Sequence, residues 1–155
     1  MIQRIQTIYL LAIVILSGIT VFSPLADLIN KPDNLIYLVD LKGISLIKAT
    51  GNIIESTIWG LTSVSAVVPV LALITLFSYK NRAKQIRLTV INMLFMLCFY
   101  IFLVIYLLPA CVRLHADWHL RLATVLPLVN LILSYLAFGA IGKDEKLVKS
   151  LDRLR

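Results

Sequence analysis

The stretch LTVINMLFMLCFYIFLVIYLLPA, residues Leu88–Ala110, contains no Asp, Glu, Lys, Arg or His. As a helix rising about 1.5 Å per residue it would be about 35 Å long. That length is enough to cross the roughly 30 Å hydrocarbon core of a bilayer. An uncharged apolar run of this length is typical of a transmembrane helix, and we predict one here.

Three further runs share this character, and they are Ile5–Phe22, Ile58–Tyr79 and Leu122–Ile141. The composition agrees, because hydrophobic residues make up 60% of the chain and charged residues only 15%, and the mean hydropathy is +0.93. Soluble domains are typically about 45–50% apolar and about 25% charged. We therefore predict an all-α membrane protein, an antiparallel four-transmembrane-helix bundle in which residues 1–155 form a single integral membrane domain.

The first run could instead be a cleaved secretion signal, because Arg4 precedes it. Its apolar stretch is longer than the roughly 7–15 residues of a signal core, and Pro24-Leu25-Ala26 is a poor cleavage site. The interpretation as a span is therefore favoured. The two cysteines, Cys98 and Cys111, do not indicate a disulfide framework.

Lysine and arginine gather on one side of the predicted spans. The N-terminal stub, the segment YKNRAKQIR and the tail 142–155 carry ten basic residues, whereas the two segments on the other side carry five. With the acids included, the two sides carry +7 and 0. Because basic residues are enriched on the cytoplasmic side, this distribution predicts that both termini are cytoplasmic.

The segment 23–57 is the one long connection, and it is expected to lie outside the cell. Its β-branched pieces flank Lys42-Gly43, which predicts a two-stranded hairpin, and a second turn at Gly51-Asn52 could extend it. Such a partly β-structured outer loop should rest on the helix ends, because an isolated hairpin is only marginally stable.

The second and third spans are joined by only about eight residues, which predicts an antiparallel helix pair. Pro69 should bend the second span, with Ser65 placed to satisfy a backbone group that the proline leaves unpaired. Pro127 is expected to act similarly in the fourth span.

The segment CVRLHADWH places Cys111, His115 and His119 at i, i+4 and i+8. A continuing helix would set them on one face, and thiolate and imidazole ligands suit zinc or copper. Pro109 and the end of the span argue against such a helix. These three residues are thus the candidate metal ligands, although neither a metal nor another cofactor is expected.

Polar residues inside a membrane are the usual markers of transport or catalysis. Here Asn92 and Asn130 are the main ones, separated in depth by roughly 10 Å of helix rise, so we expect each to bond to a neighbouring helix as packing support. The spans lack a carboxylate or base for a proton relay, and no hydrolase or nucleotide-binding motif is present. No enzymatic activity is therefore expected.

The tail 142–155 is predicted to form an amphipathic helix at the cytoplasmic surface. Its apolar residues follow a helical spacing, at Leu147, Val148, Leu151 and Leu154. The pairs Glu145–Lys149 and Asp152–Arg155 can interact along such a helix. A simple charged tail that only fixes topology is the alternative, but it would need neither the acids nor the apolar stripe.

Three stretches together resemble one known family: MIQRIQTIYLL at Met1–Leu11, YKNRAKQIRLTVIN at Tyr79–Asn92 and KDEKLVKSLDRLR at Lys143–Arg155. They are similar to an uncharacterised family of small four-span bacterial inner-membrane proteins, classified as a domain of unknown function. The resemblance implies four helices and a bacterial inner-membrane location, and it implies no activity.

The expected function is that of a non-catalytic membrane subunit or adaptor. Its cytoplasmic face would dock a cytoplasmic or membrane protein or anionic lipid headgroups, and no nucleic acid. The candidate docking residues are Arg4, Lys80, Arg82, Arg87, Asp144, Glu145, Lys149, Asp152, Arg153 and Arg155. The alternative is a small-molecule carrier or a metal or redox enzyme that uses Cys111, His115 and His119, and a homo-oligomer also remains open.

Overall fold

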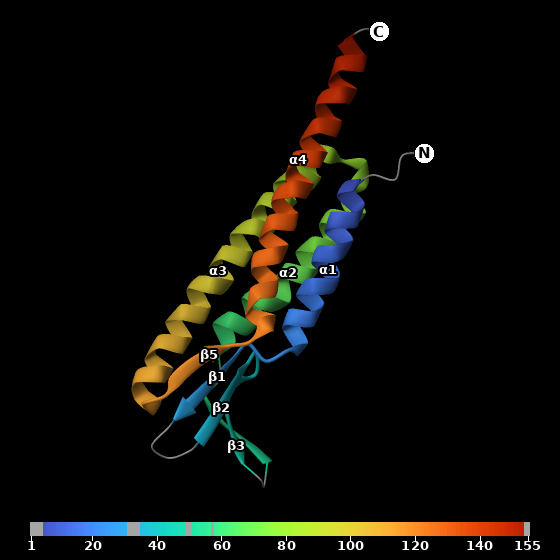
Figure 1. The fold of residues 1–155 in the computed structure, drawn as a ribbon. Coiled ribbons are helices and arrows are strands. Elements are labelled where there is room, and N and C mark those ends of the chain that lie inside the picture. Colours follow the sequence, from blue (N-terminus) through green and yellow to red (C-terminus); the bar gives the residue numbers. More distant parts are fainter. Residues whose placement is uncertain (1–4, 31–34, 49–50, 57, 154–155) are drawn as a thin grey trace.

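The computed structural model describes residues 5–30, 35–48, 51–56 and 58–153. In this part of the chain four α-helices and a five-stranded sheet are joined by two short 3-10 helices (Figure 1). The helices are α1 (Ile5–Phe22), α2 (Trp59–Phe77), α3 (Arg82–Leu114) and α4 (Leu126–Arg153), and the 3-10 helices are η1 (Ser78–Lys80) and η2 (Leu122–Val125). The strands are β1 (Ala26–Asn30), β2 (Leu35–Asp40), β3 (Gly43–Lys48), β4 (Gly51–Ser56) and β5 (Asp117–Leu120).

Three helical segments are long and apolar enough to cross a membrane: Trp59–Phe77, Arg82–Leu114 and Leu122–Lys143. The apolar part of α1, Gln6–Phe22, is shorter. The prediction of a mainly helical protein with long apolar helices is therefore confirmed. The description "all-α" is too narrow, because the chain also forms a sheet. Strands β1 to β4 lie in the connection between α1 and α2, and β5 lies in the connection between α3 and α4.

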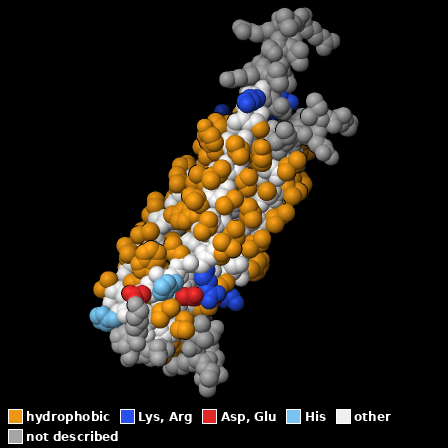
Figure 2. Space-filling view, in the orientation of Figure 1, with side chains coloured by type: hydrophobic (Ala, Val, Ile, Leu, Met, Phe, Trp, Pro, Cys, Tyr) orange, Lys and Arg blue, Asp and Glu red, His pale blue; other side chains and the backbone are white. Residues whose placement is uncertain are grey.

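The four helices pack side by side into one helical body. α1 contacts α2 and α4, and α3 contacts the same two helices, so each helix has two main neighbours. Large apolar side chains remain exposed along the outer surfaces, and Figure 2 shows them as a continuous band over the helical body. Basic side chains lie at the end from which α4 projects, and acidic, basic and histidine side chains lie at the other end. We call these two ends the basic end and the sheet end.

The connection between α2 and α3 is shorter than predicted. Only η1 and Asn81 separate the two helices, because α3 already begins at Arg82. Asn81 lies in an extended conformation and its side chain accepts a hydrogen bond from the Lys84 N–H at 3.3 Å. Such an N-cap satisfies one of the unpaired N–H groups of the first turn, and so draws residues 82–87 into the helix.

The helices accommodate their prolines. α2 continues through Pro69 and α3 continues through Pro109. Pro127 lies in the first turn of α4, where its missing N–H costs no intrahelical bond. The predicted fourth span thus divides into η2 and the first part of α4, and the bends expected at Pro69 and Pro127 stay predictions.

The sheet has the strand order β4-β3-β2-β1-β5, with every neighbouring pair antiparallel. The predicted turn at Lys42-Gly43 is confirmed, and the Asp40 Oδ1 atom accepts hydrogen bonds from both of their N–H groups at 2.8 and 3.0 Å. The second turn is misplaced in the prediction. Gly51 and Asn52 belong to β4 and pair with Lys48 and Ile47 of β3.

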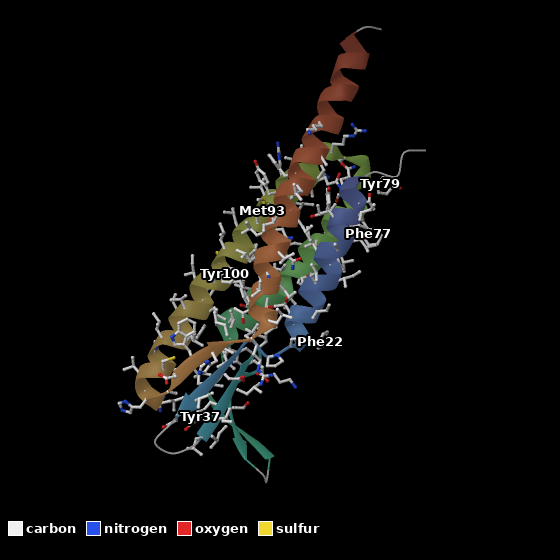
Figure 3. All side chains as sticks on the ribbon, in the orientation of Figure 1. Phe22, Tyr37, Phe77, Tyr79, Met93 and Tyr100 are labelled. Carbon is white, nitrogen blue, oxygen red and sulfur yellow. The ribbon has the colours of Figure 1, made fainter. Side chains whose placement is uncertain are left out.

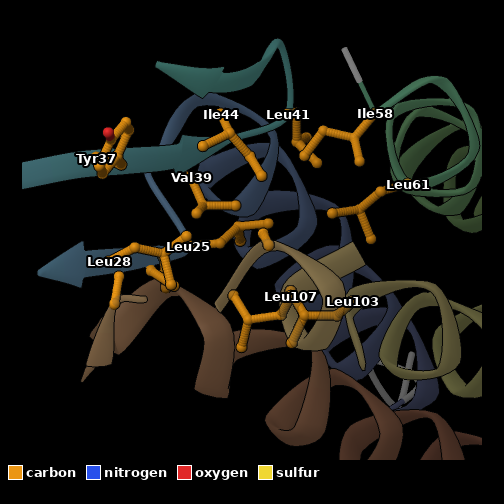
Figure 4. Packing of buried hydrophobic residues seen from close by; sticks show 14 of the residues in the cluster. Leu25, Leu28, Tyr37, Val39, Leu41, Ile44, Ile58, Leu61, Leu103 and Leu107 are labelled. Carbon is orange, nitrogen blue, oxygen red and sulfur yellow. The ribbon is translucent and has the colours of Figure 1, made fainter. Parts of the chain in front are cut away.

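The sheet is held against the helices by an apolar core (Figure 4). Leu25 and Leu28 lie near Leu103 and Leu107 of α3, and all four are buried. Each buried leucine contributes about 1.5–3 kcal/mol relative to exposure. Polar contacts fix the same junction, because the Thr124 hydroxyl donates to the Leu25 carbonyl and the Thr62 hydroxyl to the Leu41 carbonyl. The sheet therefore rests on the helix ends, as expected for the outer loop.

α4 is one continuous helix of 28 residues that runs past the other helices (Figure 1). The predicted tail helix is therefore present. It is not a separate helix lying along a surface, because its backbone continues the axis of the apolar segment.

We predict that Leu28→Ala, in the buried core between sheet and helices, destabilises the protein by about 2–5 kcal/mol. Leu28 is fully buried, so its truncation leaves a cavity that β1 cannot close without losing its pairing. Denaturant unfolding in detergent measures the change. Leu11→Ala is the matched control, because Leu11 is half exposed on the outside of α1, and an equal loss in both variants would contradict this account.

Candidate functional site

The basic end is the candidate docking site. Arg82, Lys84 and Arg87 lie in the first turns of α3, and Lys84 and Arg87 are exposed. Lys143, also exposed, lies on α4. Because α1 begins and α4 leaves the helical body here (Figure 1), the structure brings together backbone segments from the beginning, middle and end of the chain.

The placement of these bases is unfavourable for the helix itself. The N-terminus of an α-helix carries a partial positive charge, and a nearby base costs roughly 0.3–1 kcal/mol. The first turn of α3 contains no acid that would compensate. Local helix stability therefore does not explain why basic residues occur in the first turns of α3.

The helix α4 extends the basic end by a projecting arm. Ten residues, 144–153, follow Lys143 within the same helix, which corresponds to about 15 Å of rise. Five of the predicted docking residues are on this arm: Asp144, Glu145, Lys149, Asp152 and Arg153. The structure describes the backbone of these five residues. The ion pairs expected along this helix stay predictions.

The side chains of three further predicted docking residues are not described by the structure. Arg4 and Arg155 lie outside the described residues, and for Lys80 only the backbone, in η1, is described.

The candidate metal ligands do not form a site. α3 ends at Leu114, and His115 caps it in a left-handed conformation at φ 47° and ψ 42°. The chain then reverses into β5, so Cys111 and His119 lie on different elements. In the part of the chain that the structure describes, no three His, Cys, Asp or Glu residues gather closely enough to hold a metal ion. The arrangement on one helix face is therefore wrong, because the helix ends too early.

Residues that the sequence did not indicate join the two connections at the sheet end, between α1 and α2 and between α3 and α4. The Arg121 Nε–H group donates to both carboxylate oxygens of Asp27, at 2.8 and 3.0 Å. The Asn30 side chain donates to the Leu114 carbonyl at 3.0 Å and so satisfies a backbone group at the end of α3. Because these pairs are 94 and 84 residues apart in the sequence, no local pattern could have indicated them.

The interior of the helical body is more polar than expected. Buried polar side chains come from all four helices, namely Gln6, Ser17, Thr20, Ser65, Thr75, Gln85, Thr89, Asn92, Asn130 and Ser134. The carbonyl oxygens of Asn92 and Asn130 have no hydrogen-bond partner, and neither do those of Gln6 and Gln85. The side-chain oxygens of Asn92 and Asn130 therefore do not form the predicted hydrogen bonds to a neighbouring helix.

Long apolar helices with exposed apolar surfaces, ending in a basic surface on one side and a sheet on the other, define a membrane protein. The chain belongs to the family described as "Domain of unknown function (DUF4293)", whose profile matches residues 2–154. The resemblance to an uncharacterised family is thus confirmed. No curated protein matches the chain at a significant level.

We predict that Asn81→Ala lowers the free energy of unfolding by about 0.5–2 kcal/mol, because it removes the N-cap of α3. Unfolding in detergent measures the loss. Asn81→Asp is the control, since it keeps an acceptor and adds a negative charge at the helix N-terminus, and it should match or exceed the parent. Equal destabilisation by both substitutions would contradict a capping role.

Proposed function

We propose that this protein crosses a bacterial inner membrane four times and serves as a non-catalytic subunit or adaptor. It docks a protein partner on the cytoplasmic side through the basic end and the arm of α4. The observation that carries this proposal is the continuity of α4, which extends a segment rich in charged residues beyond the helical body.

The surface of α1 supports a fourth crossing. Ile8, Leu11, Ile15 and Ile19 are about half exposed, and Phe22, at the end of α1 (Figure 3), is 90% exposed, so α1 presents an apolar surface like those of its neighbours. Its 18 residues correspond to about 27 Å, close to the hydrocarbon thickness and within the roughly 17–25 residues of known spans. α1 also packs against two helices that are long enough to cross.

The charge distribution supports cytoplasmic termini. The described part of the chain begins and ends at the basic end (Figure 1), which is where basic residues are in excess in the sequence. The positive-inside rule then predicts that the sheet lies on the side of the membrane opposite the cytoplasm.

The direction of the arm favours a protein over a lipid surface as the partner. An interfacial helix lies in the membrane plane with its apolar face among the headgroups. The backbone of the arm continues the axis of a segment that is long and apolar enough to cross a membrane, so the part of the helix that carries the predicted stripe of Leu147, Val148 and Leu151 leaves the helical body along this axis. A partner that supplies an apolar groove would cover such a stripe.

A carrier or metal enzyme at the sheet end has less support. That alternative depended on Cys111, His115 and His119, and these residues do not come together as a group of ligands. The adaptor hypothesis accounts for the basic end without requiring a reaction.

The orientation can be tested by labelling single cysteines with a membrane-impermeant maleimide. In a Cys98→Ser/Cys111→Ser background, we expect Lys42→Cys to react in intact spheroplasts, because Lys42 is exposed at the turn between β2 and β3. Lys84→Cys should react only after lysis. The reverse pattern, or both positions reacting in intact spheroplasts, would contradict the proposed topology.

Docking can be tested with a double variant of the arm. Leu147→Glu/Leu151→Glu removes the predicted apolar stripe but keeps good helix formers. We expect at least a tenfold loss of the partner that crosslinks to the parent, measured by quantitative co-purification. Lys146→Gln/Lys149→Gln is the matched control, because it changes charge and keeps the stripe, and it should retain most of the partner.

The same experiment distinguishes the alternatives. Loss of the partner only in the lysine variant, together with lost binding to anionic vesicles, would indicate a lipid-binding tail. An unchanged set of crosslinked proteins in both variants and in a chain that ends at Lys143 would reject the adaptor proposal.

A further inference from the structure

A small cavity lies inside the helical body where all four helices meet. Its volume is about 10 Å³, and its polar lining consists of Ser17 and Thr20 from α1, Ser65 from α2 and Asn130 from α4. Met96 and Phe99 of α3 contribute to its apolar lining. We call this space the central cavity. A void measured in this way needs roughly 10–15 Å³ to hold one water molecule.

Asn130 requires a partner in this place. Its side chain is only 1% exposed, and its Oδ1 atom has no hydrogen-bond partner. Rotation of the amide by 180° would bring its N–H groups to the same position, and these would need an acceptor instead. Native proteins rarely leave a buried polar atom unpaired, and an unrecorded water is a common explanation.

The hydroxyl groups around the cavity show what kind of ligand fits. Ser17 donates to the Val14 carbonyl at 3.0 Å and Thr20 donates to the Leu16 carbonyl at 2.9 Å, both within α1. Their protons are thus engaged, and their oxygen lone pairs remain as acceptors. Together with Asn130 Oδ1, they form a set of acceptors that calls for a ligand with at least two donor hydrogens.

Pro69 adds a further acceptor nearby. It lies within α2, four residues after Ser65, and has no N–H group. The carbonyl of Ser65 is therefore without its usual intrahelical donor. In membrane helices such carbonyls are often satisfied by ordered water or by a neighbouring hydroxyl.

The size and the charge of the central cavity exclude larger solutes and bare cations as its ligand. A solute larger than water does not fit about 10 Å³. A bare cation would be buried without a charged partner, because none of the six named lining side chains is ionisable at neutral pH, and such burial is prohibitive. Water is neutral and has two donors and two acceptor lone pairs.

We propose that the central cavity holds one ordered water molecule that donates to Asn130 Oδ1 and to an oxygen of Ser17 or Thr20. The same molecule accepts a hydrogen bond from the Ser65 hydroxyl. It thereby joins α1, α2 and α4 at one level of the helical body, and it satisfies a side chain that the helices alone leave unpaired.

The sign of a stability change tests this proposal. Ser65→Ala removes the hydroxyl that donates to the water and adds no bulk to so small a cavity, so we expect the thermal midpoint of the full chain in detergent to fall by about 2–4 °C. If the cavity is dry, this hydroxyl has no water to bond and its removal should leave the midpoint unchanged or raise it, which would overturn the proposal. Thr75→Val is the control for loss of a buried hydroxyl, because Thr75 bonds only within α2, to the Leu71 carbonyl at 2.7 Å.

A second variant keeps the test independent of general destabilisation. Ser65→Ala and Asn130→Ala should lower the midpoint less than additively when combined, because both act through the same water, whereas the losses of Asn130→Ala and Thr75→Val should add. Additive losses in both pairs would count against a water held by Asn130.

A structure that resolves ordered solvent decides the ligand directly. The expected result is one density peak about 2.7–3.2 Å from Asn130 Oδ1 and from a hydroxyl oxygen of the lining. An empty cavity with Asn130 bonded to a neighbouring helix would overturn the proposal. A peak surrounded by six or more oxygens at about 2.3–2.6 Å would overturn it in favour of a metal cation.

Discussion

The packing of β1 against the ends of the helices is the interaction on which the rest of the structure depends. β1 lies between β2 and β5, so it is the strand that joins the connection between α1 and α2 to the connection between α3 and α4. Leu25 donates its N–H to the Val39 carbonyl at 2.8 Å, and its own carbonyl accepts from the Arg121 N–H at 2.9 Å and from the Thr124 hydroxyl. One buried segment thus positions the sheet, the beginning of η2 and the ends of α2 and α3.

The same junction explains how α3 can be so long. Its 33 residues correspond to about 50 Å, well beyond the roughly 30 Å of a hydrocarbon core. The excess at the sheet end is covered by apolar side chains of β1 and β2, and the exposed carbonyl of Leu114 is bonded by Asn30. A helix that projected into water without this support would expose apolar surface and unpaired carbonyls.

The helical body combines an apolar exterior with a partly polar interior, which is the reverse of a soluble bundle. The exterior needs no polar groups if lipid surrounds it, whereas interior amides and hydroxyls can bond only to one another, to the backbone or to trapped water. Ser17, Thr20 and Thr75 use backbone carbonyls of their own helices. The side-chain oxygens of Asn92 and Asn130 have no such local partner, so a hydrogen bond to either depends on the neighbouring helices or on trapped water.

The sequence by itself determined the helices, the charge asymmetry and the turn at Lys42-Gly43. These features are local, because an uncharged run of apolar residues or an Asp40 side chain that receives two turn N–H groups acts over a few positions. It did not determine β1, β5 or the docking of the sheet, since ADLIN and DWHL are short and become strands through pairing, β1 with β2 and β5, and β5 with β1.

Only the tertiary structure decided which side chains meet. Three contacts join residues from distant parts of the chain. They are the ion pair between Asp27 and Arg121, the hydrogen bond from Asn30 to the Leu114 carbonyl, and the polar lining of the central cavity. The same holds for the failure of the Cys111–His115–His119 pattern, which required a helix that in fact ends where β5 is drawn to β1. The physical reason is that such contacts depend on the packing of separate elements, which no local spacing in the sequence records.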